Sequence, residues 1–240
     1  MPRKALQTIK AKAFIGSAGW MVHLTKRLGM AINGTATVTN QAFENHPSEE
    51  ASVHAVTQSF VFNTLYGSDE TDMLSTHIGE DDDPYVVIIT EQRTGPTGTT
   101  DVDTFEAGQA NLSAVNENVP PADAITHTVT LPESSRHLFG FGDVAVTPFT
   151  LNAADSDVAI GEVAAGKTVL LVIERADVAS FNIEVAALGA TVYTTPGIHN
   201  LGKVAAQVSN AQVETTTTLT GQQTITGYAL VGDEQELPSG

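Results

Sequence analysis

Residues 167–188 read KTVLLVIERADVASFNIEVAAL, and this stretch indicates the fold class. Its first half contains VLLVI (169–173), an unbroken apolar run that is too short for a helix and rich in β-branched residues, as in a strand buried on both faces. Its second half contains FNIEV (181–185), in which apolar and polar residues alternate as in a strand with one exposed face. The stretch therefore predicts a protein built from packed β layers.

Further strands are predicted wherever apolar and polar residues alternate. The clearest case is 125–131, where Ile125, His127, Val129 and Leu131 share one face and three threonines share the other. By the same criteria we expect strands at 20–24, 35–39, 53–65, 85–90, 190–194 and 225–231 and turns at Asn33-Gly34 and Gly221-Gln222. Helical periodicity is confined to the first twelve residues, whose apolar spacing permits a short amphipathic helix.

These patterns predict an all-β protein, either a β-sandwich or a barrel, with roughly nine to eleven strands. A chain of 240 residues with 41% hydrophobic residues can bury a substantial core in one large β domain. We expect three parts: a basic N-terminal arm and first strand (1–30), a β-sandwich body (31–232) and an acidic tail (233–240). Within the body, residues 95–124 have the weakest pattern and are expected to form a surface excursion or a small subdomain.

Charge is distributed unevenly along the chain. The first thirty residues contain six bases and no acid, whereas the remaining 210 contain 28 acids and five bases, which gives a net charge of −17 for the whole chain. An acidic body repels nucleic acid, so we expect no specific nucleic-acid partner. The basic arm is expected to make an assembly contact with anionic lipid or with a neighbouring copy, through Arg3, Lys4, Lys10, Lys12, Lys26 and Arg27.

Several classes of site are disfavoured by the composition. The chain contains no cysteine, which excludes disulfides, thiolate catalysis and sulfur-ligated metals. The apolar stretch 13–24 is interrupted by glycines and is too short to span a membrane, and it lacks the features of a cleavable leader, so we expect the N-terminus to be retained. We expect no cofactor.

Metal binding is weakly indicated by one acidic run. Glu80, Asp81, Asp82 and Asp83 offer carboxylate oxygens to a hard cation, but they lack the spacing that arranges ligands around one ion, so a solvated loop is the default interpretation. The seven histidines are scattered over different expected elements. His127, on the apolar face of its strand, is expected to be an interior residue rather than a ligand.

Catalytic motifs are not found in the sequence. It contains no nucleophile elbow, phosphate-binding loop, dinucleotide fingerprint or H-E-x-x-H pair. Paired carboxylates of a glycosidase cannot be located from one sequence. We therefore expect a protein without enzymatic activity.

The all-β pattern, the absence of cysteine, the basic arm, the acidic exterior and the closing strand ITGYALV (225–231) together resemble a virion structural protein. In size and composition the chain is similar to jelly-roll major capsid proteins of tailless, membrane-containing icosahedral viruses, especially those of halophilic archaea. The resemblance implies a single jelly roll that assembles with copies of itself and other capsid proteins, an arm near the internal membrane, and residues 95–124 in an outward tower.

Two other classes share these features. A tail-tube, fibre or decoration protein of a tailed virus would have the same β content. A carbohydrate-binding module or glycosidase would have the same sandwich, although only one tryptophan and four tyrosines are available to form a sugar platform.

Overall fold

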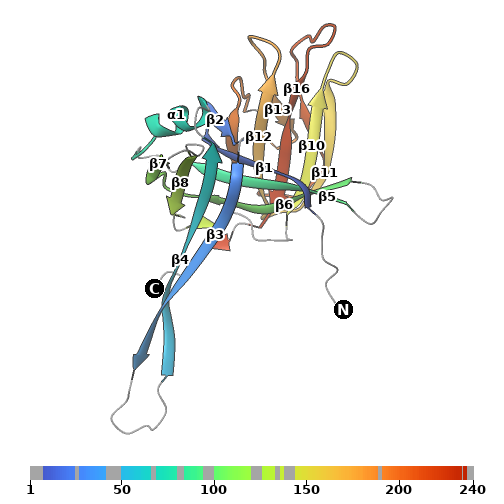
Figure 1. Ribbon diagram of the computed structural model, residues 1–240. Helices are drawn as coiled ribbons and strands as arrows, with labels where there is room; N and C mark the ends of the chain where they lie inside the picture. The colour runs from blue at the N-terminus through green and yellow to red at the C-terminus, as the bar shows by residue number, and fades with distance from the viewer. Residues whose placement is uncertain are drawn as a thin grey trace. The chain divides into compact units, whose positions relative to one another are not determined.

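A computed structural model describes residues 8–24, 27–41, 50–65, 69–79, 84–93, 100–119, 126–132, 136–137, 144–188, 191–233 and 235–236. These residues form seventeen strands and one short helix, so the predicted all-β fold is confirmed. The chain divides into two compact units (Figure 1). The first contains Met1–His23, Tyr85–Ala107 and Leu138–Glu234, and the second contains Leu24–Pro84, Gly108–His137 and Gln235–Gly240.

Two sheets of the first unit are built from residues 144–233. One has the order β10 (Ala145–Leu151), β16 (Ile225–Gly232), β12 (Thr168–Ala176), β14 (Gly197–Lys203). The other has the order β11 (Asp157–Val163), β15 (Val208–Glu214), β13 (Glu184–Ala186). Next to β13, Tyr193 pairs with Ile183 through two backbone hydrogen bonds of 2.7 and 2.8 Å.

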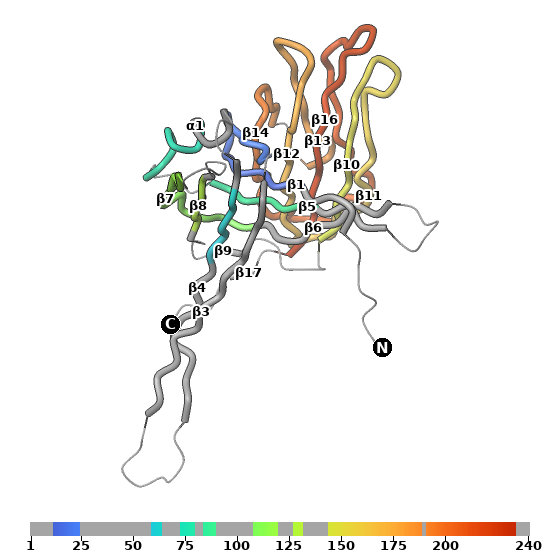
Figure 2. Tube along the Cα trace, viewed as in Figure 1, coloured from blue at the N-terminus to red at the C-terminus, as the bar shows by residue number. Residues whose placement is uncertain are grey.

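The eight strands of this region can be numbered 1 to 8 along the chain: β10, β11, β12, β13, the Tyr193 bridge, β14, β15 and β16. In these numbers the first sheet has the order 1, 8, 3, 6 and the second has the order 2, 7, 4, 5. This is the order of a jelly roll. The β-sandwich prediction is thus confirmed, and the roll occupies residues 144–233 (Figure 2). The strand predicted at 190–194 is reduced to this one bridge, and the turn predicted at Gly221-Gln222 is present.

A third sheet packs on the first sheet of the roll. Its order is β2 (Trp20–His23), β1 (Thr8–Ser17), β5 (Tyr85–Arg93), β6 (Thr100–Gln109). Phe14, Val87 and Ile89 from this sheet share one apolar core with Leu170 and Leu230 of the roll. The sequence permits a helix over 1–12, but residues 8–12 belong to strand β1 instead. Their backbone N–H and C=O groups pair with β5 and are therefore not available for helical hydrogen bonds.

Strand β12 lies at the centre of these layers. Residues 169–173 are fully buried, which confirms the prediction of a strand covered on both faces. Leu170 and Val172 contact the core shared with β1 and β5, whereas Leu171 and Ile173 contact the core between the two sheets of the roll. Full burial of each such side chain contributes about 1.5–3 kcal/mol, so this run stabilises both cores of the first unit.

Gly227 permits the close packing of the central sheet. It lies in β16 opposite Phe149 of β10 and Ile173 of β12. A Cβ atom at this position would collide with the carbonyl oxygen of Val172 and lie 2.6 Å from the Phe149 ring. The absence of a side chain here therefore allows Phe149 to cross the strand.

The second unit contains a sheet of order β3 (Arg27–Gln41), β4 (Glu50–Leu65), β8 (Thr126–Pro132), β7 (Ala114–Asn118). Its core positions alternate along β4 and β8, where Phe60, Phe62, Val129 and Leu131 are buried. A two-residue pair, β9 (Arg136–His137) and β17 (Gln235–Glu236), completes the described strands.

Strand β3 continues straight through Asn33-Gly34, so the turn predicted there is wrong. Asn33 pairs with Ser59 and Gly34 with Gln58 in a register that extends to Gln41 and Glu50. Instead, β3 runs to Gln41 and β4 begins at Glu50. A continuous ladder with β4 is the physical reason, because it satisfies backbone groups that a turn at 33–34 would have left unpaired.

Regular structure is also present in two regions where the sequence predicted no strand or helix. Asp69–Thr76 form the helix α1, which begins with Asp69, Glu70 and Asp72, acids that favour a helix N-terminus. Residues 95–124 contain β6 and β7, which pair with β5 and β8. The expected tower and the boundaries of arm, body and tail stay predictions. No helix in the described ranges is long and apolar enough to cross a membrane.

Candidate functional site

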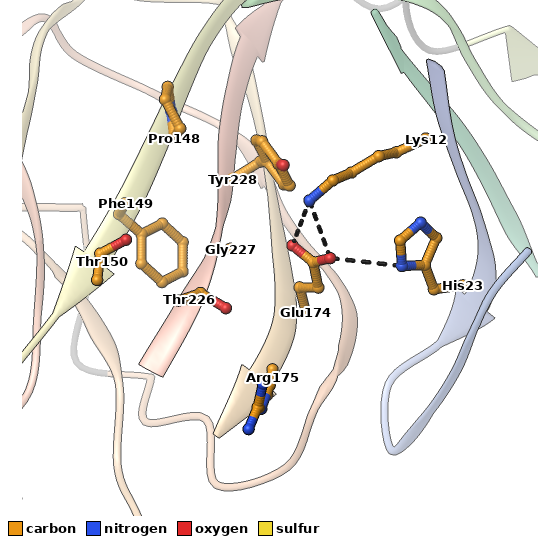
Figure 3. A pocket seen from close by; sticks show the side chains of 10 residues that line it. All are labelled: Lys12, His23, Pro148, Phe149, Thr150, Glu174, Arg175, Thr226, Gly227 and Tyr228. Carbon is orange, nitrogen blue, oxygen red and sulfur yellow. Dashed lines mark hydrogen bonds and ion pairs between the residues drawn. The ribbon is translucent and has the colours of Figure 1, made fainter. Parts of the chain in front are cut away.

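The candidate site lies in the first unit, where the apolar layer between the roll and β1 ends. On this face of the roll, Val172 of β12 is followed two residues later by Glu174, and Leu230 of β16 is preceded by Tyr228 and Thr226. Alternate residues of a strand point to the same side, so the face changes from apolar to polar within one step. A pocket of about 520 Å³ opens at this boundary (Figure 3).

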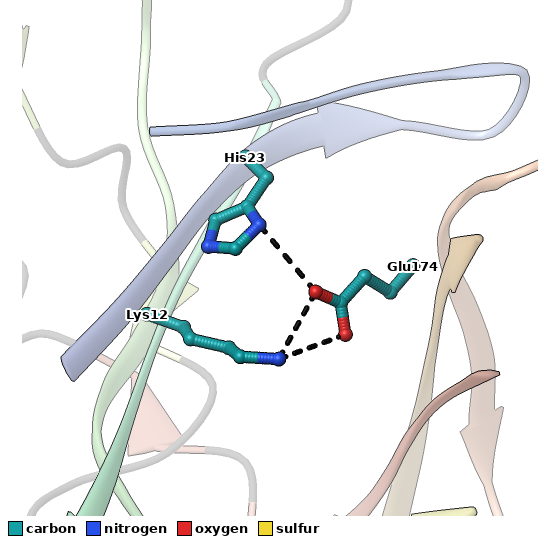
Figure 4. A network of polar contacts seen from close by, with 3 residues as sticks. All are labelled: Lys12, His23 and Glu174. Atoms are coloured by element: carbon teal, nitrogen blue, oxygen red, sulfur yellow. Dashed lines mark hydrogen bonds and ion pairs between the residues drawn. The ribbon is translucent and has the colours of Figure 1, made fainter. Parts of the chain in front are cut away.

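Three charged or titratable side chains meet at the pocket. The Nζ atom of Lys12 lies 3.0 Å from both carboxylate oxygens of Glu174, and the Nδ1 atom of His23 lies 3.4 Å from one of them (Figure 4). Lys12 comes from β1, His23 from β2 and Glu174 from β12. The network therefore joins the β1–β2 hairpin to the central strand of the roll.

Aromatic rings surround this network. The Phe14 ring lies 4.6 Å from the His23 ring and 5.9 Å from the Tyr228 ring, measured between centroids. The Lys12 Nζ atom lies 5.2 Å from the centroid of the Tyr228 ring, within the range of a cation–π interaction. The Tyr228 ring thus adds a second favourable contact for the Lys12 ammonium beside the Glu174 carboxylate.

Electrostatics favours the charged form of Lys12. Burial by itself would lower the pKa of Lys12, but hydrogen bonding and charge interactions with Tyr228 and Glu174 outweigh it, so the pKa lies above its ordinary value of 10.5. A raised pKa means that folding binds the proton more tightly. Lys12 is therefore protonated at neutral pH.

The other charged group of the pocket is also paired. The Nη2 atom of Arg175 lies 2.6 Å from a carboxylate oxygen of Asp177. The pKa of Asp177 is lowered, first by the hydrogen bond donated by the Thr224 hydroxyl and then by Arg175. Glu174 and Asp177 are thus both held by cations, and the Lys12–Glu174 pair acts as a clamp between β1 and β12.

Metal binding has no support in the described residues, since no group of three or more His, Asp or Glu side chains there could hold an ion. The weak candidates Glu80, Asp81, Asp82 and Asp83 lie outside the described residues. His127 is buried, and its Nε2 atom lies 3.6 Å from a carboxylate oxygen of Glu117. This agrees with the prediction that it is an interior residue.

Of the six predicted arm residues, the structure places the side chain of Lys12 alone. Lys10 and Arg27 lie in β1 and β3, and nothing further is described of them, whereas Arg3, Lys4 and Lys26 lie outside the described residues. The predicted assembly contact of the arm therefore stays a prediction. For Lys12 the observed partner is Glu174 of the same chain.

The sequence interpretation missed His23 and Glu174. The sequence does contain one signal for Glu174. It shares a strand face with the apolar residues Leu170 and Val172, so a charged residue at this position indicates a polar partner. Its partner could not have been inferred, since Lys12 is 162 residues away in the sequence.

Comparison with known proteins assigns no family to the chain. No family model matches, and no curated protein matches. Among solved structures, the chain is similar to one described as "Crystal Structure of SPP1 Dit (gp 19.1) Protein, a Paradigm of Hub Adsorption Apparatus in Gram-positive Infecting Phages". The sequences are 10% identical, the TM-score is 0.33, and the match covers 93% of this chain and 99% of that chain.

Proposed function

We propose that this chain is a virion structural protein that acts by assembling with copies of itself. The observation that carries the proposal is the jelly-roll strand order of residues 144–233, a fold that viral capsid domains share. Fold alone does not determine function, but the candidate site points in the same direction. Its acids and bases neutralise one another and join strands, as expected of a protein whose role is mechanical.

The first form of the proposal is a capsid building block, as the resemblance in size and composition suggests. Copies would form capsomers of an icosahedral shell, with other capsid proteins and internal membrane lipids as further partners. A chain with a net charge of −17 repels its own copies, so this form requires screening by salt.

One observation favours a second form, a tail, fibre or decoration protein. The roll occupies only residues 144–233, and the second unit is organised around the separate β3–β4 hairpin. In a shell built from one jelly roll per chain, we would expect the roll to include most of the body. A small roll joined to a second β unit departs from that expectation and suits an appendage better.

Electron microscopy of purified particles, labelled with antibodies against this chain, tests the proposal and separates its two forms. Label over the whole shell supports the capsid form, and label at one vertex or appendage supports the second. The purified chain should also form oligomers more readily as salt rises from about 0.1 M to about 1 M, because the screening length falls from about 10 Å to about 3 Å. A chain that is absent from particles and monomeric at every salt concentration would refute the proposal.

A further inference from the structure

The hairpin of the second unit is longer than the sheet that supports it. Strands β3 and β4 pair from Arg27 and Thr64 to Gln41 and Glu50, but β8 pairs only with residues 59–65 of β4. The remaining part, Gly34–Gln41 paired with Glu50–Gln58, is called the ribbon here. No other strand in the described ranges pairs with either side of the ribbon. Figure 1 shows β3 and β4 running on past β8.

A two-stranded ribbon of this kind is at best marginally stable in water by itself. Its eight residues of β3 span about 26 Å at about 3.3 Å per residue. Along each edge, alternate residues direct their N–H and C=O groups away from the partner strand, where they lack a ladder partner. A third strand or a packed surface would stabilise it.

The ribbon lacks the features by which proteins protect their sheet edges. Protected edges are short or carry proline, lysine or other charges. Most of the other edge strands follow this rule: β2 has only four residues, β10 contains Pro148, β11 contains Asp157 and Glu162, β6 contains Asp101 and Asp103, and β7 contains Glu117. The ribbon has no proline, lysine or arginine, and its one acid, Glu50, lies at its end.

The register also pairs residues of like character across the ribbon. Ala36 pairs with Val56 and Val38 with Val53, whereas Thr35 pairs with Thr57 and Thr39 with Ser52. At two further positions the pairs are mixed, Thr37 with Ala55 and Asn40 with Ala51. The ribbon contains one acid in a chain of net charge −17, so two copies can approach there at a low electrostatic cost.

We propose that the ribbon is a self-assembly arm, which pairs edge to edge with the ribbon of a second copy of this chain. The inference rests on the proposed function, because it names the contact through which copies assemble. Strand addition supplies ladder hydrogen bonds to both ribbons. It also covers an edge that would otherwise be open to indiscriminate pairing.

Charge at the edge is the first test. The double variant Thr35→Lys, Thr39→Lys places two like charges along β3 of every copy, which should abolish or strongly reduce oligomers measured by size-exclusion chromatography with light scattering. Thr150→Lys is the matched control, since it introduces the same charge at an exposed position of the edge strand β10. A shortened variant, in which Asn-Gly replaces residues 35–57, should be monomeric at 25.2 kDa less the deleted mass.

Cross-linking is the second test, and the absence of native cysteine makes it specific. Single variants Thr35→Cys, Thr37→Cys and Thr39→Cys should show one position of maximal disulfide dimer if β3 pairs with β3 around a two-fold axis, because only the residue at the axis faces its own copy. If β3 pairs with β4 of the next copy, mixing Thr39→Cys with Ser52→Cys should give the cross-link. Thr150→Cys gives the background level.

Assembly that persists in the lysine variant, without cross-links above background, would overturn the ribbon contact and leave the proposed function standing. A wild-type chain that is monomeric at all protein and salt concentrations would overturn the ribbon contact, and its absence from particles as well would overturn both. Circular dichroism of each variant checks that the β content is retained, and the shortened variant keeps the test valid if the lysine variant misfolds.

Discussion

Removing the charge of Glu174 tests whether the Lys12–Glu174–His23 network is a clamp. Glu174→Gln keeps the size of the side chain and one carbonyl acceptor, but it leaves the Lys12 ammonium without a counter-charge. The side chains of Lys12 and Glu174 are 28% and 19% exposed, which places the pair between a surface and a buried ion pair. Surface pairs contribute about 0.2–1 kcal/mol, and breaking a buried pair costs about 3–5 kcal/mol.

We therefore expect Glu174→Gln to lower the free energy of unfolding by about 1–3 kcal/mol. At about 2–4 °C per kcal/mol for a chain of this size, the unfolding midpoint should fall by several degrees. Trp20 is the single tryptophan of the chain and begins β2, the strand that ends at His23, so its fluorescence reports unfolding of the first unit. Combining Glu174→Gln with Lys12→Met in a double-mutant cycle should give a coupling energy of about 1 kcal/mol.

The same unit supplies a matched control. The Nζ atom of Lys167 lies 2.6 Å from a carboxylate oxygen of Asp233, but these side chains are 33% and 60% exposed. The cycle of Lys167→Met with Asp233→Asn should give a coupling below about 0.5 kcal/mol. If the Lys12–Glu174 coupling is no larger than this control, the network is a surface feature and the clamp interpretation fails.

Three further predictions follow from single residues. Gly227→Ala should cost about 1–3 kcal/mol or more, measured by denaturant unfolding, because the new methyl group meets the Phe149 ring in the central sheet; an unchanged midpoint would contradict the packing. Burial lowers the pKa of His199 despite a hydrogen bond to a backbone carbonyl, so stability should decline as pH falls below 6.5 through the folded pKa, and His199→Gln should flatten that decline. The pKa of Glu214 is raised, first by its hydrogen bond with Glu184. Glu214→Gln should therefore raise the free energy of unfolding at pH 7 by about 0.2–1 kcal/mol. An increase that persists below pH 4.5 or in molar salt would contradict this cause.

Local patterns predicted the strands whose environment is uniform along their length. The run at 169–173 has no polar position on either face, and it is buried on both. The alternation at 126–131 and at 181–185 likewise matches the observed burial. In each case the period of the sequence records which faces are covered, and that information is local.

The failures occurred where a distant segment decides the local structure. Asn33-Gly34 is a strong hairpin signal, but β4 lies alongside and continues the ladder past it. Similarly, Glu174 has the character of an exposed strand residue until β1 brings Lys12 to it. No pattern within a window of ten residues contains the identity of such partners, so the candidate site could not have been predicted.

The two units differ in how they treat their sheet edges, and this difference bears on how the chain would work in a particle. The edge strands of the roll are short, charged or interrupted by proline, and the Lys12–Glu174 clamp joins the third sheet to the roll. The first unit therefore pairs its backbone groups and its charges within itself. The second unit extends a long edge without charge or proline. Under the proposed function, the roll is the stable body and the ribbon is the part whose stability depends on protein concentration, because a partner copy completes its hydrogen bonding.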